Sequence, residues 1–238
     1  MLRILVANSK GGCGKTTITS SLAGYFARCG KRTTLLDCDP QGSSMAWCAQ
    51  RPAHLAPVNA VAGNNPAYGL SSGWLLRLPQ ATQILLIDTP AGLRAHEFEA
   101  LARHADVLLI PVVPSPIDLR ASLAFIDIVR KLQNVRSGRL RVGLIANRLR
   151  ERARSTRQLD AMLERLTQAA KARVRDSQTY VGLADSGRSV FDDDSAATRS
   201  HRDDWSSLMS WLEERAAELA TRSNVTPMSS VPKHVAAP

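Results

Sequence analysis

The stretch Lys10-Gly11-Gly12-Cys13-Gly14-Lys15-Thr16-Thr17 decides the fold that this sequence predicts. An apolar, strand-like run, Leu2–Ala7, comes directly before it, and a helical pattern begins at its Lys15. A phosphate-binding loop needs this context, because its glycines let backbone N–H groups come close to a phosphate chain. The N-terminus of the following helix adds further unpaired N–H groups and the positive end of its dipole. The stretch therefore predicts a phosphate-binding loop between a strand and a helix.

Three side chains of the loop have assignable chemistry. Lys15 is placed to meet the β and γ phosphates of a nucleotide, and Thr16 is placed to bind Mg²⁺. Thr17 would reach a further phosphate. The predicted nucleotide-binding set of the loop is Gly11, Gly12, Cys13, Gly14, Lys15, Thr16 and Thr17.

Strand-like and helix-like runs alternate along the rest of the chain. The strands are expected at Leu2–Ala7, Thr33–Asp37, Ile84–Ile87, Val107–Val113 and Leu140–Ala146. Most of these runs are continuously apolar, which indicates strands that are buried on both faces. Helices are expected at about Lys15–Cys29, Ala95–Ala105 and Ile117–Leu132. The pattern predicts an α/β fold, with a doubly wound, mostly parallel sheet and helices on both faces.

Two segments lack this pattern. Residues 51–80 hold four prolines and several Gly and Asn residues, so we expect loops there with one short helix near Trp74–Leu78. A last helix is expected from about Asp203 to Ala220, and the polar Thr221–Pro238 that follows has no apolar face. We therefore predict one P-loop domain over residues 1–220 and a disordered tail over residues 221–238.

The composition is that of an ordinary globular protein. The chain has 238 residues, of which 44% are hydrophobic, and no apolar run approaches the ~20 residues that cross a bilayer. Its four cysteines (Cys13, Cys29, Cys38, Cys48) form no C-x-x-C pair, so neither a zinc site nor a disulfide framework is expected. We expect a cytoplasmic protein with no membrane partner. For Cys13 two interpretations stay open: a small side chain that fits the loop, or a redox thiol at a helix N-terminus.

The positive charge is concentrated in one region. The formal net charge is +10, and residues 130–175 hold 14 Lys and Arg residues against Glu151, Asp160 and Glu164. A local excess of this size indicates a polyanionic partner, although a merely solvated basic surface has the same composition. Arg150, Arg152, Arg154 and Arg157 follow the strand expected to end at Ala146. We expect these four arginines to face solvent on a turn and to bind DNA without reading its sequence. Lys171, Arg173, Arg199 and Arg202 are the second choice.

Several motifs together resemble one family. Lys10 is a second lysine in the loop, and Ser9 stands where the general pattern has its first glycine, which resembles the deviant Walker A box of the ParA/MinD ATPases. Leu35–Ser43 resembles the second box of that family, and Ile84–Gly92 resembles its Walker B strand and second switch. Two weaker matches are Ala146-Asn147-Arg148, where the family often contacts adenine, and Gly187–Phe191, which is similar to a stretch of the short ParA branch.

The resemblance implies a chain that binds ATP with Mg²⁺ and forms a homodimer around two nucleotides. It implies that Lys10 reaches the partner's phosphates, so that Lys10, Lys15 and Asp39 form the catalytic set, with Asp39 positioning the attacking water. It further implies that Asp88 holds Mg²⁺ through water together with Thr16, and that Asp37 supports the metal shell or the loop. Asn147 and Arg148 join the nucleotide-binding set by the same resemblance.

The resemblance also indicates which branch of the ParA/MinD ATPases this chain is similar to. The first strand starts at once, so we expect no N-terminal helix-turn-helix domain, and the tail carries no amphipathic stripe of the kind that binds membranes. The expected function is that of a short ParA-type, nucleoid-associated ATPase. Such a protein binds non-specific DNA as an ATP dimer, positions a cargo such as a plasmid, a chromosome region or a carboxysome, and is released when a cargo adaptor stimulates hydrolysis. The alternative is a metabolic P-loop enzyme that uses ATP on a small acid, with a substrate pocket from residues 51–80.

Overall fold

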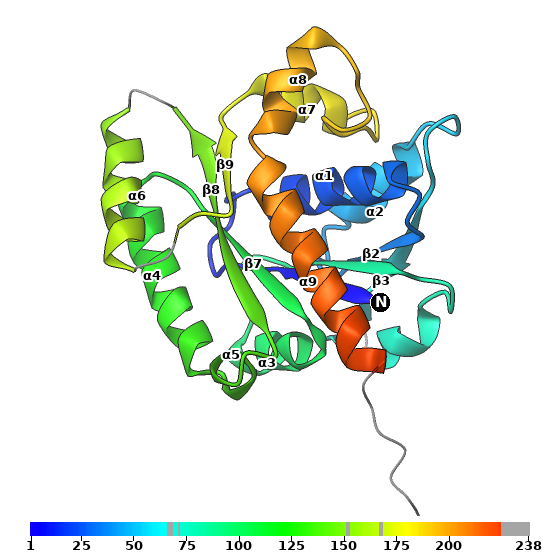
Figure 1. Ribbon diagram of the computed structural model, residues 1–238, viewed down its shortest axis with the longest axis horizontal. Coiled ribbons are helices and arrows are strands. Elements are labelled where there is room, and N and C mark those ends of the chain that lie inside the picture. Colours follow the sequence, from blue (N-terminus) through cyan, green and yellow to red (C-terminus); the bar gives the residue numbers. More distant parts are fainter. Residues whose placement is uncertain (66–68, 71, 151–152, 167–168, 225–238) are drawn as a thin grey trace, which may run out of the picture.

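The fold is a parallel β-sheet between two layers of helices (Figure 1). The computed structural model describes residues 1–65, 69–70, 72–150, 153–166 and 169–224. Seven strands make the sheet in the order β3-β2-β6-β1-β7-β8-β9, and every pairing is parallel. Their bounds are β1 Leu2–Val6, β2 Thr33–Asp37, β3 Val58–Ala62, β6 Ile84–Asp88, β7 Val107–Val112, β8 Arg141–Leu149 and β9 Ala172–Arg175. The predicted doubly wound architecture is confirmed.

The helices divide into two layers. The first layer is α1 (Lys15–Arg28), α2 (Ser43–Gln50), α7 (Gln178–Ala184) and α9 (Ser206–Asn224), which bury one face of the sheet around Ile4 and Leu109. The second layer is α3 (Ala95–His104), α4 (Pro116–Lys131) and α6 (Arg154–Arg165), which bury the other face around Leu5 and Leu108. Short elements complete the chain: α5 (Gln133–Arg136), α8 (Ala196–Asp203), a 3₁₀ turn (Ser72–Arg77) and the pair β4 (Asn64–Asn65) and β5 (Gly69–Leu70).

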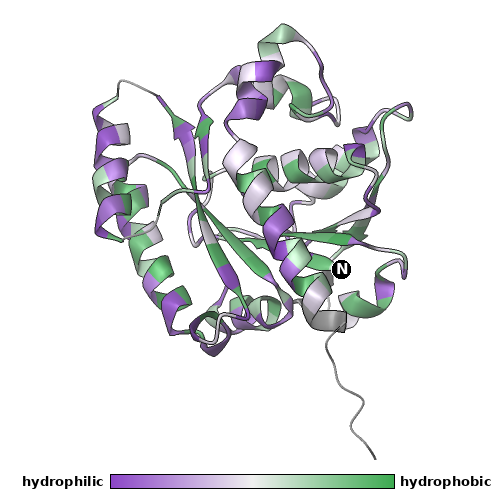
Figure 2. Cartoon of the chain, in the orientation of Figure 1, coloured by the Kyte–Doolittle hydropathy of each residue, from purple (hydrophilic) through white to green (hydrophobic). Residues whose placement is uncertain are grey.

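The central strands are buried because their side chains are apolar on both faces, as parallel sheets require. The four residues Leu85, Leu86, Ile87 and Asp88 of β6 have no exposed surface at all. Figure 2 shows hydrophobic residues along the central strands and hydrophilic residues over the outward side of α6. Burying one such aliphatic side chain is worth about 1.5–3 kcal/mol, so each of these buried strands contributes to stability.

Three boundaries differ from the prediction. Residues 51–80 contain β3, which pairs with β2 at the edge of the sheet, and its half-exposed Val and Ala residues hide the strand pattern. β8 continues past Ala146 to Leu149, because Leu149 still pairs with Arg175 of β9 across a register shift. α9 runs to Asn224, four residues past the expected end of the helix, and residues 225–238 of the expected tail lie outside the described part of the chain. No helix in the described ranges is both long enough and apolar enough to cross a membrane.

Candidate functional site

The glycine-rich loop joins the carboxyl end of β1 to the N-terminus of α1. Gly14 has φ of 91°, a left-handed conformation that favours glycine, and Gly12 has φ of 71°. A Cβ atom on Gly14 would also collide with the Asn147 amide, which donates a 2.8 Å hydrogen bond to the carbonyl of Cys13. Glycine at position 14 is therefore required twice, by its backbone angle and by the side chain that closes over it.

Lys15 is held inside the loop. Only 7% of its surface is exposed, and its ammonium group donates a 2.9 Å hydrogen bond to the carbonyl of Lys10. Cys13 is buried beside it, and its thiol donates to the same carbonyl at 3.3 Å. Burial raises the pKa of the Cys13 thiol above its ordinary value, although the Lys15 charge opposes this. The geometry favours the small-side-chain interpretation of Cys13 over a reactive thiolate.

Asp88 lies at the centre of a cluster of hydroxyl groups. Its carboxylate accepts hydrogen bonds from Thr16 Oγ1 at 2.7 Å, from Ser44 Oγ at 2.6 Å and from Thr19 Oγ1 at 3.4 Å. Complete burial raises the pKa of Asp88 to about 6, against the lowering effect of the Ser44 and Thr16 hydrogen bonds. Thr16 and Asp88 thus present a hydroxyl and a carboxylate oxygen to the same point, which are the ligand atoms that Mg²⁺ prefers.

The buried charge of Asp88 should cost the nucleotide-free protein stability. The pKa rises from 3.8 to about 6, so the unfolded chain loses this proton first, and the free energy of unfolding falls as the pH rises between about 4 and 6. The full cost, on the order of 3 kcal/mol, is present above pH 6. We expect Asp88→Asn to unfold at a higher urea concentration than the unaltered protein at pH 7 and at a similar one at pH 4. The exposed Asp203→Asn is the control, and a less stable Asp88→Asn protein at pH 7 would contradict the assignment.

Asp37 is the last residue of β2, and Asp39 follows it in the turn that leads to α2. The Asp37 carboxylate accepts backbone hydrogen bonds from Asp39 at 3.0 Å and from Met45 at 2.9 Å. Its burial raises its pKa, while these two bonds lower it. Asp39 is half-buried, its carboxylate accepts only the Gln41 N–H among the described hydrogen bonds, and it lines the cavity above the loop. Asp37 thus anchors the turn, and Asp39 faces the space in front of the loop.

Lys10 is not among the described residues that line the cavity above its own loop. Its ammonium group lies 3.5 Å from the carboxylate of Asp118 in the first turn of α4, and about a third of each side chain is exposed. The two lysines of the loop therefore have different environments: Lys15 is buried within the loop and Lys10 reaches outward. An exposed ion pair of this kind contributes little stability.

Two adjoining cavities flank the loop. The first, about 530 Å³, is lined by Gly11, Gly12, Gly14, Lys15, Thr16, Thr17, Asp39, Pro40, Gln41, Ser43, Thr89, Pro90, Ala91 and Arg148. The second, about 330 Å³, shares Thr17 and Arg148 with the first and adds Asn147 and the segment Asp176–Gln178. Arg148 is the one described residue other than glycine with a positive φ, 55°, so its side chain is turned out between the two cavities at a cost in backbone strain.

The predicted nucleotide-binding residues other than the buried Cys13 therefore line one or both of these two cavities. Sequence reasoning missed Ser44 and Thr19, which bond Asp88, and Ser177 and Gln178, which line the second cavity. Ser44 follows the second box directly, and its hydroxyl beside a buried strand-end aspartate was the available signal. Ser177 and Gln178 carry no such signal, because only the pairing of β8 with β9 brings them to the site.

The four arginines expected on a turn are not equivalent. Arg150 is exposed, as predicted, but its guanidinium group pairs with the Asp176 carboxylate at 2.9 Å. Arg152 lies outside the described residues. Arg154 and Arg157 are exposed, but on the first turn of α6 rather than on the preceding turn.

The segment Gly187–Phe191 has a structural role in the described chain. A Cβ atom on Gly187 would collide with the backbone of Arg51, and Arg51 forms a 2.7 Å ion pair with Asp192 in which both side chains are almost completely buried. This segment therefore packs against the end of α2, behind the site.

Comparisons with known proteins agree with this geometry. The model of the CobQ/CobB/MinD/ParA nucleotide-binding domain matches residues 4–182. Maintenance of carboxysome distribution protein A from Halothiobacillus neapolitanus is 31% identical over 193 residues, which cover 79% of this chain and 86% of that protein.

Solved structures show the same fold. An ATP complex of a Cyanothece McdA variant superposes with a TM-score of 0.65 at 18% identity, covering 96% of this chain and 98% of the other. MinD from Aquifex aeolicus superposes with a TM-score of 0.65 at 19% identity, covering 88% and 97%. With the loop, the Asp88 cluster and the two cavities in place, this chain is an ATPase that belongs to the CobQ/CobB/MinD/ParA family of nucleotide-binding proteins.

Proposed function

We propose that this ATPase positions a protein cargo, the carboxysome, inside the cell. The observation that carries the proposal is the 31% identity to a carboxysome distribution protein over most of both chains. In the proposed cycle the ATP-bound protein is a homodimer that binds non-specific DNA on the nucleoid. A cargo adaptor stimulates hydrolysis, and the dimer leaves the DNA. The working unit is the single domain over residues 1–220, in the cytoplasm.

The roles of the site residues follow from their positions. The N–H groups of the loop and the buried Lys15 ammonium group would hold the phosphates in the larger cavity, and Asn147 and Arg148 would border the base in the smaller one. Thr16 and Asp88 would hold Mg²⁺, which supplies positive charge between the β and γ phosphates when bound. Asp39 faces the open side of the loop and would orient the attacking water.

Lys10 is the residue that we propose acts on the partner subunit. Its own loop already contains Lys15, and its side chain is directed outward to Asp118. In the proposed dimer, the Lys10 side chain would turn from Asp118 to the phosphates bound by the facing subunit. Such a group stabilises the charge of phosphoryl transfer in the way that an arginine finger does.

Lys10→Ala should therefore separate dimer formation from nucleotide binding. We expect ATP affinity within about threefold of the unaltered protein but at least tenfold fewer ATP-dependent dimers, because one interface cation per subunit is lost. Light scattering at matched ATP saturation measures the dimers. Asp118→Ala is the control, because it removes the ion-pair partner and leaves Lys10 in place. Intact ATP dimers and normal turnover in Lys10→Ala would count against a role in the partner's site.

The DNA surface is proposed at the start of α6. Arg154 and Arg157 occupy its first turn, which has no acidic residue, although the helix dipole favours negative charge there. These two arginines therefore lower the stability of this end of the helix, and an anionic ligand would offset their charge. Guanidinium groups pair well with phosphate oxygens, so the surface suits the DNA backbone.

The double variant Arg154→Glu/Arg157→Glu should lose DNA binding and keep its fold. Removing two phosphate contacts should flatten the slope of log affinity against log salt by about two. The acidic replacements suit the helix N-terminus, so the unfolding temperature should not fall. Arg77→Glu/Arg103→Glu changes the net charge equally at other exposed positions and serves as the control. If the α6 variant binds duplex DNA like the control at every salt concentration, the surface lies elsewhere, with Lys171, Arg173, Arg199 and Arg202 as the next set.

The metabolic alternative has less support from the site. It needs a substrate pocket built from residues 51–80, and no described residue of that segment lines either cavity beside the loop. The ATPase rate measured with and without DNA, and with and without the product of the neighbouring gene, tests the two functions directly. Stimulation by both supports the positioning cycle, whereas stimulation by a small carboxylic acid alone supports the alternative.

A further inference from the structure

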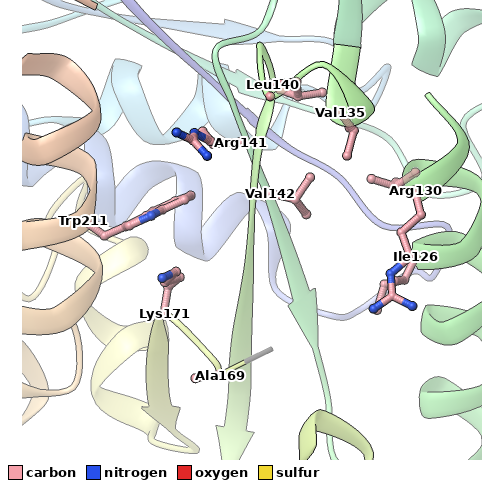
Figure 3. A pocket seen from close by; sticks show the side chains of 11 residues that line it. Ile126, Arg130, Val135, Leu140, Arg141, Val142, Ala169, Lys171 and Trp211 are labelled. Atoms are coloured by element: carbon pink, nitrogen blue, oxygen red, sulfur yellow. The ribbon is translucent and has the colours of Figure 1, made fainter. Parts of the chain in front are cut away.

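A third cavity lies at the opposite end of the sheet from the nucleotide site. Its volume is about 460 Å³, and it wraps around the start of β8 (Figure 3). Ile126 and Arg130 of α4 and Val135 of α5 line one side. Lys171, which directly precedes β9, and Trp211 of α9 line the other, as the labelled side chains show. β9 pairs with β8 only from Ile145 onward, so the first residues of β8 extend past β9. This cavity is here named the β8 pocket.

The indole wall of the β8 pocket is built into the fold. Trp211 lies over Gly143, where a Cβ atom would come within 2.9 Å of the ring, so this glycine makes the space in which the indole sits. The Lys171 ammonium group lies 5.1 Å from the centre of the same ring. The other three tryptophans, Trp47, Trp74 and Trp205, are buried, whereas Trp211 is partly exposed.

Three cations surround an apolar floor. Arg130, Arg141 and Lys171 line the β8 pocket together with Ile126, Val129, Val135, Leu140 and Val142. Arg141 lies 3.6 Å from Glu218, with about half of each side chain exposed. Within the described ranges, neither Arg130 nor Lys171 has a carboxylate within ion-pair distance. Residues 126–142 carry five Lys and Arg residues against Asp127 alone, so the charge around the pocket is also positive.

We propose that the β8 pocket binds an acidic peptide segment of a partner protein, with one apolar side chain of that segment on the aliphatic and indole surface. Carboxylates of the segment would pair with Arg130, Arg141 and Lys171 at the rim. An apolar anchor in a hollow with a charged rim is the usual anatomy of a peptide interface. The inference stands apart from the proposed function, because it needs neither nucleotide nor DNA.

Two other occupants fit less well. Duplex DNA offers phosphates to the cations but has no apolar group that projects into a hollow lined by Val, Leu and Trp side chains. The chain's own residues 225–238 follow α9, but they carry one lysine and no acidic residue, so their charge does not complement the pocket. Of these three occupants, only an acidic segment of a partner protein complements both the cations and the apolar floor.

A ligand in the β8 pocket would leave the phosphate-binding loop open. β8 runs from Arg141 at this pocket to Asn147 at the nucleotide site, six residues that span roughly 20 Å at about 3.3 Å each. A partner could therefore remain bound here while nucleotide enters or leaves.

The experiment uses Trp211 as its own reporter. The probes are short unlabelled peptides that consist of Asp and Glu around one central Leu, Phe or Met. They are titrated into the full chain without nucleotide, and tryptophan emission and its quenching by acrylamide are measured. We expect the acidic set to protect Trp211, and the same peptides with Asn and Gln to have no effect. Trp211→Phe should remove the optical signal but keep binding by calorimetry within about fivefold, because the ring remains aromatic.

Charge reversal locates the site. Arg130→Glu/Lys171→Glu should weaken peptide affinity at least tenfold, whereas the exposed Arg77→Glu/Arg103→Glu, with the same net charge, should not. ATP affinity should be unchanged in both variants, so failure of this inference is distinguishable from failure of the proposed function. Two results would overturn it directly: no acidic peptide binds at about 1 mM, or both double variants lose peptide binding equally. It would also be overturned if duplex DNA displaces the peptide and the binding of that DNA requires Arg130 and Lys171.

Discussion

Replacing Lys15 by alanine is expected to abolish measurable MgATP binding. Lys15 is the only lysine buried in the loop, and its ammonium group already lies among the loop carbonyls, within 2.9 Å of Lys10 O. A charged hydrogen bond contributes about 1.5–3 kcal/mol, and one ammonium group can donate more than one to a phosphate chain. We therefore expect an affinity loss of at least a hundredfold in a calorimetric titration with MgATP.

The control for this experiment is Lys31→Ala. Lys31 is exposed just beyond the end of α1, so its replacement removes the same charge without affecting the loop. Circular dichroism should show that both variants are folded. Unchanged ATP affinity in Lys15→Ala would show that Lys15 does not bind the nucleotide and would contradict the assignment of the loop and its two cavities as the nucleotide site.

Asp39→Ala should bind ATP and turn it over at least a hundredfold more slowly. Asp39 lines the cavity in front of the loop, and its carboxylate accepts only one described hydrogen bond, from Gln41. A residue that orients water stabilises the transition state more than the bound substrate, so kcat falls while affinity stays within a few-fold.

Asp37→Ala provides the contrast. The Asp37 carboxylate accepts the backbone N–H groups of Asp39 and Met45, so its loss should loosen the turn and weaken binding and turnover together. Single-turnover measurements on both variants separate the two effects. A wild-type rate in Asp39→Ala would move the water-positioning role to another residue on the open side of the loop.

The parts of the fold that could be predicted are those in which local pattern and burial agree. The strand over Thr33–Asp37 and the helix that begins at Lys15 were predicted at their observed starts, because continuous apolar runs and the glycine-rich loop define them locally. β3 was missed because an edge strand of Val, Asn and Ala between proline-rich segments has little burial to report. Its presence depends on the neighbouring β2, which a local pattern does not contain.

The site divides in the same way. Lys15, Thr16 and Asp88 were predicted from motifs, and the structure brings them together. Arg150 was predicted to face solvent, and it does, but the pairing of β8 with β9 also brings Asp176 beside it as an ion-pair partner. The Ser44 hydroxyl beside Asp88 also depends on tertiary contact, since α2 must fold over β6 for them to meet. Pairings between distant segments are thus what the sequence alone did not show.

The central place of β1 has a consequence for how the protein is made. Leu2 pairs with Ile84 of β6 and Ile4 with Val107 of β7, so the first strand to leave the ribosome is flanked by strands that follow much later. Until the segment up to Val112 has emerged, nearly half of the chain has been made and β1 lacks at least one of its two neighbouring strands. Parallel pairings at such separations form slowly, and unpaired apolar strands aggregate. Newly made chains should therefore depend on chaperones throughout the first half of synthesis, and a stalled ribosome before β7 should leave an insoluble fragment.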